Sequence, residues 1–173
     1  MSMDTLAALM EDEIKDLYSA ENQLLKALPK LAKKAEDPKL KNAFTSHLAE
    51  TEGHVARLQT IGEELGIKLG GKKCKAMEGL IEEGKEVLEE DGQSAIIDAA
   101  LIGAAQRVEH YEMAAYGTVR AMAQELGHSN IAKLLQSTLN EEAAADKKLT
   151  GIAESSVLAA ANAAGEEEVE EVE

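Results

Sequence analysis

Four stretches of the chain repeat an apolar residue at alternating intervals of three and four positions. This spacing keeps the apolar side chains on one face of an α-helix, because the helix completes a turn every ~3.6 residues. The stretches lie within residues 4–35, 37–65, 94–126 and 129–162. Each is long enough to bury a continuous apolar stripe against the others. The sequence therefore predicts an all-α fold in which four long helices form an antiparallel bundle.

Capping residues mark several of the predicted helix ends. Asp37 and Pro38 form a start signal, with aspartate as the N-cap and proline at the first helical position. Gly66 offers a C-cap to the second long helix, and Ser94 offers an N-cap to the third. Residues 73–90 predict an additional short helix between these two long helices.

Acidic residues outnumber basic ones throughout the chain and dominate its end. Residues 163–173 are rich in glutamate and have no apolar face, which predicts an acidic disordered tail after one bundle domain at 1–162. The whole chain carries 33 acidic and 18 basic side chains, for a formal net charge of −15. Such a surface repels nucleic-acid phosphates and anionic lipids, so neither nucleic acid nor membrane is expected as a partner.

The cysteine content and the apolar runs predict a cytoplasmic protein. Cys74 is the one cysteine of the sequence, so no intrachain disulfide can form. The first residues lack the features of a secretion signal, and no apolar run approaches the ~20 residues that span a bilayer. Exposed apolar positions on the short helix and on the alanine-rich third long helix favour a homodimer.

Acidic side chains interrupt the apolar stripes near the middle of the long helices. Three of the stripes contain one glutamate each: Glu21, Glu112 and Glu142. The second long helix carries Glu50 on the same broad face as His54. A buried unpaired carboxylate costs several kcal/mol, and no Lys or Arg lies nearby on these stripes. A pair of metal ions is the economical partner, because iron and manganese accept carboxylate and imidazole ligands.

Helical spacing extends the set of candidate ligands. Residues three or four positions apart share a helix face, so Glu109 can join Glu112, and Asp146 can join Glu142. The first two long helices and the last two also repeat the same arrangement of acids. The complete candidate set of metal ligands is Glu21, Glu50, His54, Glu109, Glu112, Glu142 and Asp146.

Several segments resemble one known family over about residues 3–158. The resemblance rests on DLYSAENQLLKALPKLAKKA, HLAETEGHVARL, KCKAMEGLIEEG, DAALIGAAQRVEHYEMAAYGT and LLQSTLNEEAAADKKLT, which are similar to the YciE/YciF family (DUF892) of ferritin-like, stress-associated bacterial proteins. It implies a ferritin-like bundle with a dinuclear metal centre, of iron more than of manganese. It also implies roles for the ligands, with Glu50 and Glu142 bridging the ions, Glu21 and Glu112 terminal, and Glu109 additional.

The chain departs from the rubrerythrin pattern within this resemblance. The Glu-x-x-His pairs of that pattern would require histidines at two positions that are Gly53 and Ala145 here. His54 and Asp146, one residue later, are the expected substitutes. The ligand types predict reduction of O2 or hydrogen peroxide coupled to metal oxidation. The resemblance implies a stress response as the context of this reaction. No catalytic residue is assigned.

Each assignment has a structural alternative. The glutamates could form a protonated or hydrated polar layer that sets the helix register. His54 could be a core histidine bonded to a neighbouring glutamate, while His47 and His110 are expected to orient ligands or to lie at the surface. The tyrosines near this level are expected to be packing residues: Tyr18, Tyr111 and Tyr116. The alternative function is a non-catalytic bundle that acts as a structural or interaction module.

Overall fold

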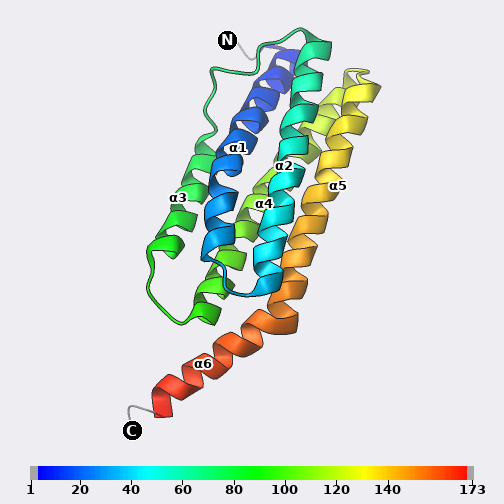
Figure 1. The fold of residues 1–173 in the computed structure, drawn as a ribbon. Coiled ribbons are helices and arrows are strands. Elements are labelled where there is room, and N and C mark those ends of the chain that lie inside the picture. Colours follow the sequence, from blue (N-terminus) through cyan, green and yellow to red (C-terminus); the bar gives the residue numbers. More distant parts are fainter. Residues whose placement is uncertain (1–3, 171–173) are drawn as a thin grey trace.

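The structure, a computed structural model, describes residues 4–170, and within this range it contains helices and no strand. The all-α prediction is confirmed. Four long helices lie side by side (Figure 1): α1 (Leu6–Lys34), α2 (Pro38–Leu65), α4 (Ser94–Glu125) and α5 (Ser129–Ile152). The predicted short helix is α3 (Lys75–Glu89), which packs against α1 and α4. None of the described helices has the length and apolar character that crossing a membrane requires.

Neighbouring long helices run in opposite directions. The most extensive packing joins α1 to α2 and α4 to α5, and the two pairs meet where α1 contacts α4 and α2 contacts α5. In Figure 1, α1 and α5 descend while α2 and α4 ascend, so each of these contacts is antiparallel. The long connection between α2 and α4 includes α3 and returns the chain from one end of the bundle to the other.

The cap predictions succeed at α2 and fail at α4. Asp37 Oδ1 accepts hydrogen bonds from the backbone N–H groups of Lys39 and Leu40, at 2.8 and 3.0 Å. Gly66 adopts a φ of 66°, the left-handed conformation of a glycine C-cap. Ser94 was predicted to cap α4, but it is the first residue of the helix, and Gln93 occupies the N-cap position.

The C-terminal helix differs from the prediction. After α5, residues Ala153–Val157 form a π-helical turn, and α6 (Leu158–Glu170) then leaves the bundle at an angle, in contact with α4 (Figure 1). Residues 163–170 are therefore helical where a disordered tail was predicted. The alanine-rich start of α6 has a high helix propensity, which favours continuation of the helix. Residues 171–173 of the predicted tail lie outside the described residues.

The buried apolar residues form two clusters along the bundle. One lies toward the α1–α2 turn and includes Leu28 and Leu40, and the other lies toward the α4–α5 turn and includes Val119 and Ile131. Between them is a set of buried polar side chains, which we call the polar layer: Glu21, His47, Thr51, His54, Glu109, Glu112, Thr138 and Glu142. Every long helix contributes to this layer, so it interrupts the apolar core at one level.

Candidate metal centre

The polar layer contains six potential metal ligands from four helices. They are Glu21 from α1, His47 and His54 from α2, Glu109 and Glu112 from α4, and Glu142 from α5. On α2 the two histidines are two turns apart, and on α4 the two glutamates are one turn apart, so each pair shares a face. All six side chains are buried, and four of them have no measurable exposure: Glu21, His54, Glu112 and Glu142.

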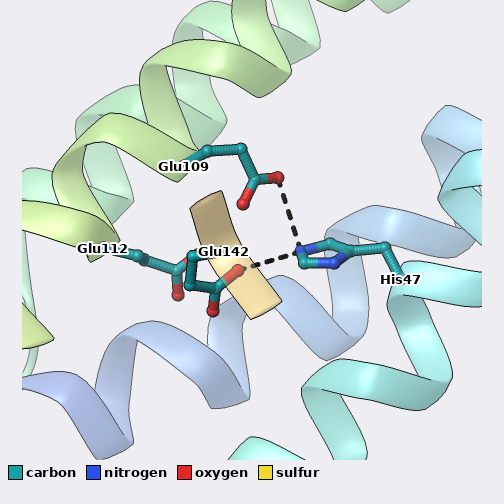
Figure 2. A group of neighbouring side chains, drawn as sticks. All are labelled: His47, Glu109, Glu112 and Glu142. Atoms are coloured by element: carbon teal, nitrogen blue, oxygen red, sulfur yellow. Dashed lines mark ion pairs between the residues drawn. The ribbon is translucent and has the colours of Figure 1, made fainter. Parts of the chain in front are cut away.

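The ligand atoms form two groups that share one carboxylate. The first group comprises His47, Glu109, Glu112 and Glu142 (Figure 2). The second group comprises Glu21, His54 and Glu142. Within each group, one donor atom from every residue lies within 4.8 Å of the others. Glu142 belongs to both groups, with Oε2 facing His47 and Oε1 facing His54, so its carboxylate would be available to a cation in either group.

Glu50 contacts His47 of the first group from the solvent side. His47 Nε2 lies 3.4 Å from Glu109 Oε1 and 3.7 Å from Glu142 Oε2, the two contacts dashed in Figure 2. The other ring nitrogen, His47 Nδ1, is 3.1 Å from Glu50 Oε2. A proton on Nδ1 donated to Glu50 leaves the Nε2 lone pair directed into the group, which is the arrangement of a histidine that binds a metal.

The second group has a similar outer support. His54 Nδ1 lies 2.9 Å from Glu142 Oε1 and 3.4 Å from Glu21 Oε1. His54 Nε2 lies 2.9 Å from Glu141 Oε2. Arg57 donates to both oxygens of the Glu141 carboxylate, from Nη1 at 2.5 Å and from Nη2 at 2.7 Å. Glu141 is therefore fixed by Arg57 and can accept the His54 Nε2 proton, which leaves Nδ1 to face the two buried glutamates.

Most donor atoms of the two groups have no hydrogen-bond partner among the described residues. The unpartnered atoms are Glu21 Oε2, His47 Nε2, His54 Nδ1, Glu109 Oε2, both Glu112 oxygens and both Glu142 oxygens. His54 Nδ1 lies close to Glu142 Oε1, but this contact does not have the geometry of a hydrogen bond. A buried polar atom without a partner costs about 1–3 kcal/mol. Carboxylate oxygens and imidazole nitrogens gathered in this way fit a divalent cation, which would satisfy them together.

Burial also changes the protonation of the layer. Loss of solvent, reinforced by the neighbouring carboxylates, raises the pKa of Glu109 and Glu112 well above the usual range, and burial raises the pKa of Glu21. Burial alone would lower the pKa of His54, but the Glu142 and Glu21 carboxylates beside Nδ1 outweigh it and raise the pKa to about 10. Without a cation the layer therefore retains protons, and a bound cation would compete with them.

Two predicted ligands lie outside the two groups. The Glu50 side chain is 48% exposed and contacts His47 from the outside. At this level of α2 the inward position belongs to Thr51, which is fully buried, and Glu50 is rotated away from it by about 100°, the turn per residue of a helix. The bridging role that the family resemblance implied for Glu50 does not match this position.

Asp146 is turned toward α4 instead of the layer. Its Oδ1 accepts a hydrogen bond from Gln106 Nε2 at 3.0 Å and lies 3.3 Å from His110 Nε2. On α5, Ala145 follows Glu142 by about one turn and lies on the inward face. Asp146 is the next residue, rotated by about 100° from Ala145 toward α4. The structure therefore does not place Asp146 with the other candidate ligands.

His47 and Tyr116 contact the candidate ligands more closely than the sequence predicted. His47 was expected outside the ligand set, yet it lies in the first group. Its spacing from Thr51 and His54 follows the same three-and-four pattern as the apolar stripes, which was a usable signal. Tyr116 is 1% exposed, and its hydroxyl donates a hydrogen bond to Glu21 Oε1 at 2.5 Å, so it orients this carboxylate as well as packing.

Comparisons with known proteins agree with one another. A family described as a domain of unknown function (DUF892) matches residues 5–169. Protein YciF of Escherichia coli is 49% identical over 154 residues, which is 88% of this chain and 93% of that protein. The crystal structure of YciF, described as a stress protein, has a TM-score of 0.85 and covers 87% of this chain and 96% of its own.

Two further solved structures are similar. YcfI from Rhodopseudomonas palustris, provisionally described as a structural protein, is 43% identical with a TM-score of 0.83, covering 87% of this chain and 97% of its own. A protein from Xanthomonas campestris is 19% identical with a TM-score of 0.72, covering 91% of this chain and 97% of its own. The similarity to the Xanthomonas campestris protein supports only the fold.

Proposed function

The chain belongs to the DUF892 family, and we propose that it is a ferritin-like four-helix-bundle protein whose polar layer binds a dinuclear iron or manganese centre. The observation that carries the proposal is the convergence of unpartnered buried donor atoms in two groups that share Glu142. The proposed ligands are Glu21, His47, His54, Glu109, Glu112 and Glu142. Glu50 and Asp146 are not included among the resident ligands.

The chemistry of the donors favours these two metals. Carboxylates suit manganese and iron, and the two imidazoles favour iron. The one thiol, that of Cys74, lies against the Tyr111 hydroxyl at 2.9 Å and outside both groups. The two groups of described residues therefore contain no thiolate of the kind that selects Cu(I).

We propose that the centre reduces O2 or hydrogen peroxide in a stress response, in keeping with the description of E. coli YciF as a stress protein. A bound metal pair supplies a redox couple and open coordination positions. The chain supplies the surroundings: Glu142 joins the two positions, Tyr116 orients Glu21, and the apolar clusters on both sides exclude bulk water. A homodimer and a cytoplasmic location remain predictions from the sequence.

Metal analysis tests this proposal directly. The protein is stripped with a chelator, reloaded with Fe(II) or Mn(II) without oxygen, desalted and analysed for both elements. We expect about two ions per chain. Anomalous scattering measured on each side of the iron and manganese edges should locate both ions in the polar layer. Reloaded protein without stoichiometric metal would contradict the proposal.

The alternative is a structural module whose polar layer holds protons in place of metal. The raised pKa values of Glu109 and Glu112 favour it, since protonated carboxyls avoid the cost of buried charge. The provisional description of YcfI as a structural protein points the same way. This alternative predicts that a chelator leaves the thermal unfolding temperature unchanged, whereas a metal centre predicts that the chelator lowers it.

Glu141→Gln is expected to weaken metal binding without removing a ligand. Glutamine keeps the size of the side chain but loses the charge that pairs with Arg57 and accepts the His54 proton. Loss of an outer partner of a metal-binding histidine typically costs 10–100-fold in metal affinity. Competition with a chromophoric chelator measures the change. Glu125→Gln, at the exposed end of α4, is the matched control, and equal affinities for the two variants would contradict the supporting role of Glu141.

A further inference from the structure

A cavity between α2 and α5 connects the protein surface to the first ligand group. Its volume is about 120 Å³, which is room for several water molecules. The buried side chains of His47 and Glu109 lie at its inner end, and Glu50, Ala144 and Lys148 line its exposed end. We call this cavity the α2–α5 channel. We propose that it is the path by which divalent cations reach the metal centre.

Small side chains keep the channel open. Ala43 on α2 and both Ala144 and Ala145 on α5 line it, and each ends at Cβ. Ala145 is one turn after Glu142, on the same helix face, so its side chain points toward the level of the ligands. A larger residue at position 145 would occupy this space. The open space of the channel therefore depends on the small side chain of Ala145.

The charges along the channel attract cations. Glu50, Glu109 and Glu141 line it, against one ammonium group, that of Lys148. The pKa of Glu109 is raised and Glu141 is paired with Arg57, so Glu50 carries the negative charge that would concentrate cations at the exposed end. Lys148 Nζ donates to Ser46 Oγ at 3.1 Å, which holds its positive charge toward α2 at the exposed end. Lys148 should therefore slow the arrival of cations.

Glu50 has the position of a transit ligand. Its carboxylate is half exposed, lines the channel and contacts His47 Nδ1, while the opposite nitrogen of that ring faces Glu109 and Glu142. A cation entering from solvent would meet Glu50 before it meets any buried ligand. This inference rests on the proposed metal centre, and it gives Glu50 a role in metal delivery in place of permanent coordination.

The rate of Co(II) uptake tests the channel. Co(II) is stable to air oxidation in many carboxylate sites and is followed by its visible absorption after rapid mixing with metal-free protein. Ala145→Leu should fill the channel and slow uptake by about tenfold or more, with the final stoichiometry unchanged. Ala143→Leu adds the same side chain to an exposed position of α5 outside the channel and should take up Co(II) at the wild-type rate. Equal rates for both variants would overturn the proposal.

A charge reversal provides a second test that does not alter packing. Lys148→Glu should accelerate Co(II) uptake by about two- to fivefold at low salt, and the difference should shrink as salt is added. Lys147→Glu changes the net charge equally but lies outside the channel, so it should have a smaller effect. Equal acceleration by the two variants would show that the overall charge, and not this channel, guides the ions.

The equilibrium stoichiometry separates the remaining outcomes. Glu50→Gln removes the charged partner of His47 Nδ1 and should weaken affinity and slow uptake, but at saturating Co(II) it should still reach the wild-type content. A variant that stays one ion short at equilibrium would make Glu50 a resident ligand and overturn its transit role. Wild-type protein that binds no Co(II), Fe(II) or Mn(II) at all would overturn both the metal centre and the channel, whereas normal binding with unchanged Ala145→Leu kinetics overturns the channel alone.

Discussion

Glu142→Gln is expected to eliminate both metal ions, while Glu21→Gln should eliminate one. Glu142 is the one residue that belongs to both ligand groups, and Glu21 belongs only to the second. Glutamine preserves the volume of either side chain, so the fold should persist, but a neutral amide is a poor bridge between two cations. We expect the metal content to fall from about two ions per chain to nearly none in Glu142→Gln and to about one in Glu21→Gln.

Elemental analysis after reloading measures both variants, and far-ultraviolet circular dichroism checks that the helices remain. Glu125→Gln, on the exposed end of α4, controls for loss of one negative charge and should retain the wild-type metal content. If Glu142→Gln and Glu21→Gln each lost a single ion, the shared role of Glu142 would be wrong. Two independent mononuclear sites would then be the better description.

Glu112→Leu is expected to stabilise the metal-free protein. Glu112 is fully buried, and neither of its side-chain oxygens has a hydrogen-bond partner among the described residues. Removing one such unpartnered group should raise the free energy of unfolding by about 1–3 kcal/mol. For a chain of this size that corresponds to an increase of roughly 2–12 °C in the unfolding temperature. The same variant should lose metal from the first group, so stability and metal binding should change in opposite directions.

The stabilisation by Glu112→Leu should grow as the pH rises. The pKa of Glu112 is raised well above 4.5 in the folded state by burial first and by the neighbouring carboxylates second. Because the folded state then holds a proton that the unfolded state releases above its own pKa, wild-type stability falls as the pH increases through this range. The leucine variant lacks this loss, so its advantage should be smallest near pH 4 and larger at pH 7.

Thermal unfolding in the presence of a chelator at several pH values measures this difference. Glu125→Leu is the matched control, because an exposed substitution should change stability by less than about 0.5 kcal/mol. If Glu112→Leu gave no gain at neutral pH in chelator-treated protein, Glu112 would have a stabilising partner other than a metal ion. The polar layer would then not depend on a cation for its stability.

The sequence predicted the inward direction of some acids better than of others. Glu21, Glu112 and Glu142 lie within the apolar stripes, and all three are fully buried. Glu50 was predicted to point inward because it lies near the edge of the broad apolar face of α2. At the edge of a face, a helix rotation of one residue moves a side chain from the core to solvent. Sequence spacing alone could not decide between Glu50 and the neighbouring inward position, because the rotation of α2 depends on its contacts with α1 and α5.

The sequence by itself determined that the chain is helical and that acids interrupt its apolar stripes, because both follow from a helical period that is local to each segment. Only the tertiary structure decided which donor atoms meet. The sharing of Glu142 between two groups, the inclusion of His47 and the channel beside Ala145 depend on how the helices are rotated and spaced against one another. These relations arise from packing between residues far apart in sequence, which no local period encodes.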